Sequence, residues 1–481
     1  MNPNDTSPSP NMPPMETLSQ AGVNPMQPAV PPTPLAPTLA SPNPRFSRKL
    51  IAILGVLILL IGIAIPALLA IFRNTPGLGG QANLVWWGLW DEQSSIQPLI
   101  DEYTKAHPNV TIEYIKQSPQ DYRERLTSQL ASGRGPDIFR IHSSWVPMFR
   151  SVLAQVPSST IAPSDFVQTF YTTVSRDLVV GSQPLALPLQ FDSIALFVNE
   201  EIFDTYLKSP PTTWDELRDL AKQLTIKDET GAIIQSGVAL GTTQNVDYWP
   251  EVLALLMIQN QVDLTNPSSG QAAVAVDYFT RFSREDGVWD ETLPASTAMF
   301  AQGKLAMYFG TSQGAVEIKK LNPNLRFRVV EVPQLPKSSI DEPDIFYASY
   351  WAEGVNEDSK SKTVAFDFLK FMLQKENVEQ FYKAAVVKTY PRTDMQNAVA
   401  SDPISGAFVT QGKEAKSWYL HSQTFDGPTG INSQLVKYFE EAVDTVAAGG
   451  SPQTAVVTAA KGVQQVLAQY GIIKAPVATP K

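Results

Sequence analysis

The chain has 481 residues with a formal net charge of −10, and 43% of its residues are hydrophobic. This length exceeds what one ordinary hydrophobic core holds, so we expect two or more packed units. The acidic balance argues against nucleic acid and anionic lipid as partners. The sequence contains no cysteine, which excludes metal sites built on thiolates and a lipid-modified cysteine.

The first 44 residues are rich in Pro, Ser, Asn and Thr and contain no Lys or Arg. A segment of this composition cannot bury enough apolar surface to offset its ordering entropy. We therefore predict that residues 1–47 form a disordered, Pro-rich tail. A Pro-rich ligand for a partner protein is the alternative interpretation.

Residues 50–72 are all apolar, Gly or Pro. At about 1.5 Å per residue, a helix of this length crosses a hydrocarbon core of roughly 30 Å. Three basic residues closely precede the run and only Arg73 follows it closely, which predicts a cytoplasmic N-terminus and an extracytoplasmic remainder. We expect residues 48–73 to be a single-pass anchor that contacts the membrane through residues 50–72. A cleaved signal peptide is the alternative, although its apolar part usually spans only about 7–15 residues.

Residues 74–82 are predicted to be a short flexible linker, and residues 83–475 to be the main folded domain. Residues 1–73 carry four basic and two acidic residues, so the overall charge of −10 leaves about −12 on the remainder. The extracytoplasmic part is therefore strongly acidic.

Strand and helix patterns alternate at the start of this domain. Residues 84–87 are typical of a strand, 96–103 of a helix, 110–115 of a strand, 126–130 of a helix end and 137–141 of a strand. This βαβαβ order predicts a parallel sheet covered by helices.

Residues 193–199 (SIALFVN) form an apolar run that is typical of a strand buried on both faces. A helix start follows, because Thr213 can cap the helix while Glu216 reaches back to it. The later part of the chain is mainly helical. Helices are predicted at 249–259, 272–282, 365–373, 378–384, 431–446 and 452–470, and strands at 322–333 and 348–355.

Three motifs in this order resemble one protein family. They are GRGPDIF at 133–139, FDSIALFVNEEIF followed by PPTTWDELRDLAKQLT within 191–225, and FAQGKLAM at 300–307. Together they resemble the extracellular solute-binding proteins of ABC importers, in the large sugar-binding branch similar to maltose-binding protein. The resemblance covers about residues 83–472.

The resemblance implies an α/β fold of two lobes joined by hinge crossings, the periplasmic-binding-protein-like fold. The chain would first cross between the lobes at about residues 187–192. The first lobe would comprise about 83–187 and 307–357, with 307–333 contributing its returning strands. The second lobe would comprise about 192–306 and 358–475.

The implied function is capture of a carbohydrate in the cleft between the lobes and its delivery to the permease subunits of an ABC importer. Two other hypotheses remain open at this point. One is a sensor with the same fold, which the Pro-rich tail favours, and the other is a surface glycosidase.

No catalytic, metal or cofactor site is predicted. The three histidines have no metal-ligand spacing, and the sequence contains no GxSxG, P-loop or HExxH motif. His142 directly precedes Ser143 and Ser144, but adjacent side chains on a strand point to opposite faces. We therefore expect a binding protein rather than an enzyme.

Candidate ligand contacts are aromatic residues next to polar ones, since a sugar has C–H faces that stack on rings and hydroxyls that need polar partners. Several of these pairs follow predicted strands, where ligands bind in α/β sheets. The candidates are Trp90, Asp91, Ser144, Trp145, Phe191, Asp192, Tyr248, Trp249, Thr311, Ser312 and Trp351, with Arg392 as a looser match. Alternation along the strand puts Tyr350 and Trp351 on opposite faces, and we favour Trp351 as the cleft residue.

The anchor hypothesis predicts that the mature protein keeps residues 1–47. The intact mass of protein extracted from membranes checks this, because an uncleaved anchor leaves the tail attached. A mature N-terminus beyond residue 72 would instead identify a cleaved signal peptide and a released protein.

Overall fold

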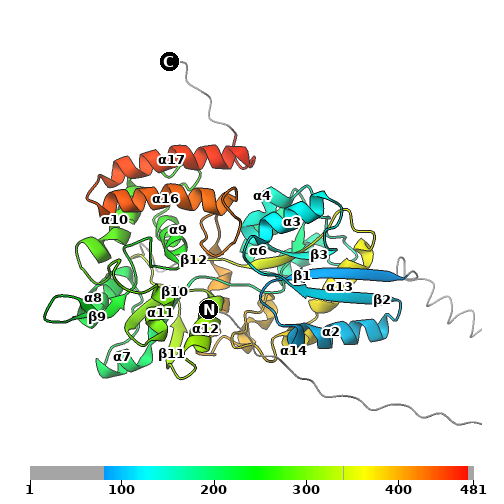
Figure 1. The fold of residues 1–481 in the computed structure, drawn as a ribbon, viewed down its shortest axis with the longest axis horizontal. Helices are drawn as coiled ribbons and strands as arrows, with labels where there is room; N and C mark the ends of the chain where they lie inside the picture. The colour runs from blue at the N-terminus through cyan, green and yellow to red at the C-terminus, as the bar shows by residue number, and fades with distance from the viewer. Residues whose placement is uncertain (1–80, 338, 340, 475–481) are drawn as a thin grey trace, which may run out of the picture. The chain divides into compact units, whose positions relative to one another are not determined.

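The computed structural model describes residues 81–337, 339 and 341–474. The predicted tail and membrane anchor lie outside these residues, as does nearly all of the linker. Within the described part, no helix combines the length and apolarity needed to cross a lipid bilayer. The described strands form two five-stranded sheets and two small two-stranded sheets (Figure 1).

The first sheet has the strand order β2-β1-β3-β13-β6. Its strands are β1 (Ala82–Gly88), β2 (Val110–Lys116), β3 (Ile138–His142), β6 (Ala186–Leu187) and β13 (Trp351–Val355). β1 pairs in parallel with β2 and β3, whereas β13 runs antiparallel to β3 and β6. Helices α2 (Gln93–Ala106) and α3 (Tyr122–Ala131) connect the three parallel strands, which confirms the predicted βαβαβ order. We call this sheet and its helices the first lobe.

The second sheet has the order β11-β7-β10-β9-β8. Its strands are β7 (Ala195–Asn199), β8 (Ile226–Lys227), β9 (Ile233–Val238), β10 (Leu305–Gly310) and β11 (Phe327–Val330). β7 pairs antiparallel with both β10 and β11, and all of its residues are buried. The apolar run at 193–199 thus contains the expected buried strand. We call this sheet and its helices the second lobe; Figure 1 draws it at the left and the first sheet at the right.

The remaining elements fall into three groups. The helices that follow the second-sheet strands or pack beside them are α7 (Glu200–Thr205), α8 (Trp214–Leu224), α9 (Trp249–Gln259), α10 (Gly270–Arg284), α11 (Ser296–Ala301), α12 (Ser312–Leu321), α16 (Ile431–Ala447) and α17 (Pro452–Gln469). Between β3 and β6 lie η1 (Ser143–Trp145), α4 (Val146–Phe149), α5 (Pro163–Thr169), α6 (Thr172–Leu178), β4 (Val179–Val180) and β5 (Gln183–Pro184). The other elements are β12 (Phe346–Tyr347), α13 (Lys362–Met372), α14 (Lys375–Phe381), η2 (Thr393–Ala398), α15 (Gly406–Thr410), η3 (Gln411–Lys413) and β14 (Ala415–Lys416).

Two parts of the chain belong to the lobe opposite to the one expected. β10 and β11 pair with β7 in the second sheet, so the expected assignment of 307–333 to the first lobe is wrong. The return to the first sheet comes later, at β13. α13 and α14 then pack against α2 of the first lobe, so the second lobe does not begin again at residue 358. An apolar strand marks burial, but its sequence does not identify its partner strand.

The helix that follows the first crossing begins as predicted. Thr213 accepts a hydrogen bond from the Glu216 amide while the Glu216 side chain accepts from the Thr213 amide, so the capping box at the start of α8 is confirmed. Ser451 likewise caps α17, whose first residue is Pro452.

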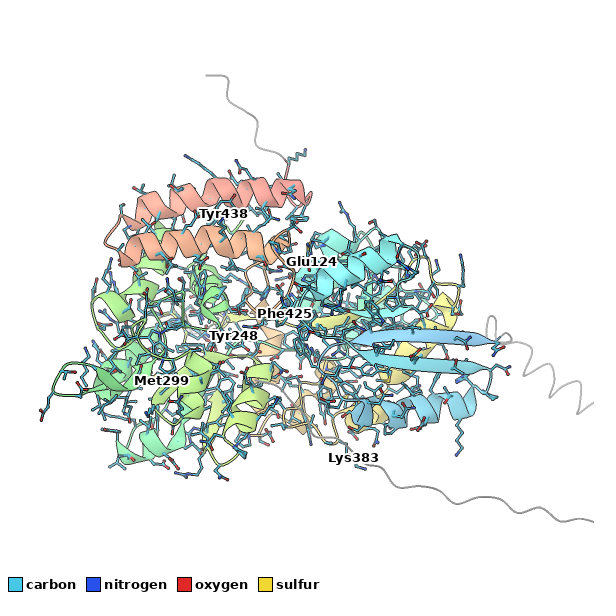
Figure 2. The ribbon with its side chains drawn as sticks, viewed as in Figure 1. Glu124, Tyr248, Met299, Lys383, Phe425 and Tyr438 are labelled. Carbon is cyan, nitrogen blue, oxygen red and sulfur yellow. The ribbon has the colours of Figure 1, made fainter. Side chains whose placement is uncertain are left out.

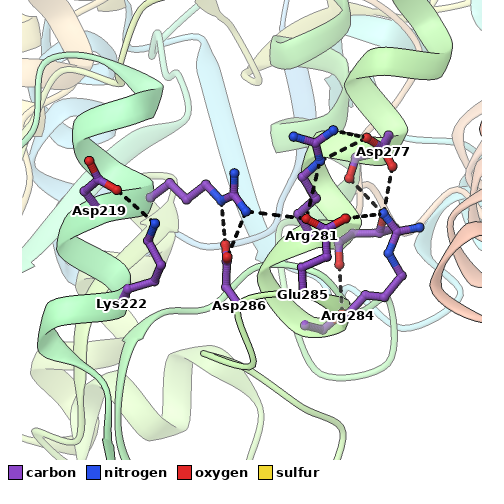
Figure 3. Close-up of polar contacts among 10 residues, drawn as sticks. Asp219, Lys222, Asp277, Arg281, Arg284, Glu285 and Asp286 are labelled. Atoms are coloured by element: carbon purple, nitrogen blue, oxygen red, sulfur yellow. Dashed lines mark hydrogen bonds and ion pairs between the residues drawn. The ribbon is translucent and has the colours of Figure 1, made fainter.

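Arginine–carboxylate pairs join the surface of α8 to the end of α10 (Figure 3). Arg218 of α8 donates two hydrogen bonds to Asp286, with the shorter N–O distance at 2.6 Å. On α10 itself, Arg281 and Arg284 both pair with Asp277. These pairs are half-buried, whereas fully exposed ion pairs typically contribute at most about 1 kcal/mol each. In this cluster, each carboxylate nevertheless has a cationic partner.

Candidate functional site

A cleft of about 530 Å³ is lined by residues of both lobes. Trp90 follows β1, Ser349 lies two residues before β13 and Trp351 begins it, so these three come from the first lobe. Tyr248, just before α9, comes from the second lobe. Figure 2 places Tyr248 and Phe425, a further lining residue, near the middle of the described fold.

Most of the predicted site residues line this cleft. They are Trp90, Asp91, Asp192, Tyr248, Thr311, Ser312 and Trp351. All of them except Tyr248, which directly precedes α9, sit at strand ends or on the first crossing between the lobes. In α/β sheets, ligands bind beyond the ends of the strands.

The first-lobe side of the cleft is aromatic. The ring centroids of Trp90 and Trp351 lie 6.0 Å apart in an edge-on arrangement, and Phe425 lies 5.6 Å from Trp90. Trp351 is only 7% exposed and also contacts His142 and Trp145, so it belongs to the core as well as to the cleft. Trp90 is more exposed. Of the two indoles, Trp90 therefore offers the more accessible face to a ligand.

Tyr350, the neighbour of Trp351, points elsewhere. It is fully buried, and its hydroxyl donates a 3.0 Å hydrogen bond to Asp177, away from the residues that line the cleft.

Asp192 joins the crossing to the second lobe. Its carboxylate accepts hydrogen bonds from the Ser193 amide at 2.9 Å and from both the amide and the hydroxyl of Ser312, the first residue of α12. Burial raises the pKa of Asp192 to about 7, and the hydrogen bonds from Ser312 and Ser193 oppose this rise. These bonds fix the crossing against the start of α12.

Asp91 is held by a buried arginine. The Arg140 guanidinium pairs with Asp91 and with Glu353, which lies on the neighbouring strand β13. Glu353 also accepts a 2.9 Å hydrogen bond from the Trp86 indole. The charge of Asp91 is therefore already matched within the first lobe.

Ser144 and Trp145 are not cleft residues, contrary to the prediction. Both lie in η1, a turn that directs them into the interior. Trp145 is fully buried and its ring stacks with those of Tyr122 and Phe149. The Ser144 hydroxyl is hydrogen bonded to His142 and Asn432 instead.

Phe191, Trp249 and Arg392 also do not line this cleft, contrary to the expected position. Phe191 is fully buried, with its ring 4.2 Å from that of Tyr171. Trp249 is the first residue of a helix that is buried throughout. The Arg392 guanidinium pairs with Asp394, two residues away, and so closes a local turn.

Several lining residues were not among the predicted ones, including Asp247, Glu251, Glu317 and Phe425. Glu251 had a detectable signal, since it is the only charged residue in the apolar helix WPEVLALLMIQ. A charge on an otherwise buried helix is rare without a partner or a function. Phe425 had no such signal, because it lies in an irregular loop with no periodic pattern.

The side chains of Ser144 and His142 meet, since alternation along a strand separates His142 from its direct neighbour Ser143 but not from Ser144. The Ser144 oxygen lies 2.7 Å from the His142 Nδ1 because η1 turns the chain back. The other ring nitrogen of His142 faces the hydroxyl of Ser349 rather than a carboxylate, so no acid orients the ring as in a catalytic triad. Among the described residues, no group of His, Asp and Glu has the arrangement of a metal site.

Residues 87–379 match the family model described as bacterial extracellular solute-binding protein. The chain belongs to this family. It is accordingly a solute-binding protein rather than an enzyme, as the three sequence motifs indicated.

Several known proteins resemble this solute-binding protein. A binding protein of Brucella abortus (strain 2308) is 24% identical over 295 residues, which are 58% of this chain and 69% of the relative. The diacetylchitobiose binding protein of Streptomyces coelicolor is 21% identical over 310 residues, which are 62% of this chain and 70% of the relative.

Solved structures extend the similarity of fold. The cyclic α-maltosyl-1,6-maltose binding protein of Arthrobacter globiformis has a TM-score of 0.65 at 20% identity, covering 81% of this chain and 100% of the other. The sugar-binding protein MalE of Xanthomonas citri also has a TM-score of 0.65, at 16% identity, with 80% and 98% covered. At such identities the similarity establishes the two-lobed α/β fold.

The environment of Glu251 predicts a pH-dependent stability. Burial raises its pKa from 4.5 to about 7, so the folded chain binds more protons than the unfolded chain between these values. Stability from this group is present at low pH and is lost as the pH rises through 7. Glu251→Gln keeps the shape of the neutral acid, so its gain in unfolding free energy over wild type should grow from less than about 1 kcal/mol at pH 4.5 to roughly 3 kcal/mol at pH 8.

Denaturant unfolding of both proteins across this pH range measures the difference. Glu441→Gln, at an exposed position on α16, removes the same charge and should give a flat difference. A flat difference for Glu251→Gln as well would contradict the burial effect.

Proposed function

We propose that this protein is a membrane-anchored, extracytoplasmic receptor that captures a carbohydrate in its cleft and presents it to the permease subunits of an ABC importer. The observation that carries the proposal is the composition of the cleft. An aromatic wall of Trp90, Trp351 and Phe425 lies in the same cavity as carboxylates and hydroxyls of the second lobe. The volume of about 530 Å³ falls in the usual range for small-molecule sites, roughly 300–1,000 Å³.

This composition suits a saccharide in two ways. The C–H face of a sugar ring packs on an indole face, and the exposed part of Trp90 provides one. The hydroxyls at the ring edge need acceptors and donors, which Asp247, Thr311 and Ser312 can supply. Relatives named for saccharides support the same class, including a maltotriose-binding protein of Pyrococcus abyssi that is 25% identical over 146 residues, 30% of this chain and 31% of that protein.

The remaining parts of the proposal concern movement and location. The lobes would close on the ligand by a hinge at the crossings, a known motion of such proteins. The apolar residues 50–72 would hold the protein at the membrane beside its permease. A lipid-modified cysteine cannot serve as the anchor, because the chain has no cysteine.

Binding is tested by thermal unfolding of the full-length protein in detergent against saccharides, amino acids, peptides and polyamines. A ligand that binds only the native state raises the melting temperature, by an amount that grows with its concentration. We expect the increase with at least one saccharide. An increase confined to amino acids or peptides would contradict the proposal, and cleavage of an oligosaccharide would contradict a role in binding alone.

Mutations of the two cleft tryptophans should have different effects. Trp90→Ala should weaken saccharide binding by roughly 1–3 kcal/mol and have little effect on folding, since the ring is partly exposed. Trp351→Ala should lower the unfolding free energy by about 3–5 kcal/mol, because its ring is packed in the core. Titration calorimetry and denaturant unfolding on both variants give the comparison. Unchanged affinity in Trp90→Ala would remove Trp90 from the binding site.

A further inference from the structure

The charge of the cleft is one-sided. Six carboxylate residues line it, namely Asp91, Glu92, Asp192, Asp247, Glu251 and Glu317, whereas none of its lining residues is Lys, Arg or His. Asp91 pairs with Arg140 and Glu92 with Lys116. Within the described part of the chain, the other four take part in no ion pair, in contrast to the carboxylates on the α8–α10 surface, which are matched by arginines (Figure 3).

Two of these four carboxylates have structural partners. Asp192 accepts hydrogen bonds at the start of α12. Asp247 accepts from the hydroxyl of Ser296 and from the amide and hydroxyl of Thr297, at the start of α11. Carboxylates are stabilised at helix N-termini, so these two need no ligand to explain them.

Glu251 differs from both. Its Oε1 accepts hydrogen bonds from the amide and hydroxyl of Ser422, at 2.8 and 3.0 Å, but its Oε2 has no partner. The residue is only 1% exposed and lines the cleft. A buried carboxylate oxygen without a donor costs free energy that a ligand donor would recover.

Among the residues that the structure describes, no cation fills this role. His421 precedes Ser422 in the same loop, but burial lowers its pKa to about 3 and keeps it uncharged. Glu317 of α12 adds a further carboxylate on the exposed part of the lining, again without a hydrogen bond or ion pair among the described residues. A negatively charged ligand would be repelled from such a cleft.

We propose that the ligand is an amino-substituted saccharide whose protonated amine binds the free oxygen of Glu251. This inference rests on the proposed carbohydrate function and narrows its substrate class. A neutral hydroxyl can donate to the same oxygen, but an ammonium also compensates the charge, and hydrogen bonds between charged groups are roughly twice as strong. The acidic lining of the cleft also excludes sugars that carry carboxylate or phosphate groups.

Three disaccharides that differ only at C2 test the inference. They are β-1,4-linked glucosamine dimer, which carries amines, diacetylchitobiose, which carries acetamides, and cellobiose, which carries hydroxyls. Calorimetric titration of the full-length protein in detergent at pH 7 should give an affinity at least tenfold higher for the amine than for either neutral sugar. The monosaccharides glucosamine, N-acetylglucosamine and glucose repeat the comparison without a glycosidic linkage.

Variants then locate the effect. Glu251→Gln should reduce the preference for the amine to less than threefold, and Glu317→Gln, the same change on the exposed lining, should reduce it less. Glu441→Gln on α16 removes the same charge outside the cleft and should keep the full preference. Because a glutamine is nearly isosteric, unfolding curves can establish that each variant is folded before titration.

The outcomes separate this inference from the proposed function. Equal or tighter binding of a neutral sugar would overturn the amine and leave the carbohydrate function standing. Spermidine binding as tightly as the amino sugars would overturn the saccharide class, since charge alone would then suffice. Failure of every saccharide to bind would overturn the proposed function together with the inference.

Discussion

The first lobe is organised around one buried guanidinium. Arg140 lies in the middle of the first sheet, on β3, and is almost inaccessible to solvent. A charge at that depth is tolerated only with partners, and losing one of them typically costs about 3–5 kcal/mol. Glu353 provides the partner on β13, and it accepts in turn from the Trp86 indole on β1. The third group, Asp91, reaches the same guanidinium from the cleft, so one ion-pair network holds three strands and a lining residue in register.

This network gives the two walls of the cleft different characters. On the first-lobe side the aromatic rings pack against one another and Asp91 is neutralised by Arg140. On the second-lobe side the carboxyl groups of Asp247 and Glu251 accept hydrogen bonds from neutral donors only. A ligand between the walls meets an apolar face and an acidic face at once. Orientation of the ligand then follows from its own distribution of apolar and polar groups.

Local features of the fold could be predicted from the sequence, and non-local ones could not. The alternating elements up to residue 142 and the capping box of α8 depend on neighbours in the chain, and both were confirmed. The lobe to which β10 and β11 belong is set by the strand with which they pair. An apolar run does not identify that partner strand. The site residues show the same division between local and non-local features. Trp90 and Trp351 were found because they adjoin strands, whereas Trp145 follows a strand too but is turned inward by η1. No local sequence pattern marked Arg140 and Glu353, because their ion pair joins two strands that are far apart in the sequence.

The distance in sequence between Arg140 and Glu353 affects the order in which the two sheets can form during synthesis. The two residues are 213 positions apart, so at about 5–20 residues per second Glu353 is synthesised roughly 10–40 s after Arg140. All strands of the second sheet, by contrast, lie in one uninterrupted stretch between residues 195 and 330. The second sheet can therefore be completed while the first still lacks β13. The sheet whose coding sequence begins first is thus the one that is completed last, and its guanidinium stays unmatched by Glu353 throughout that interval.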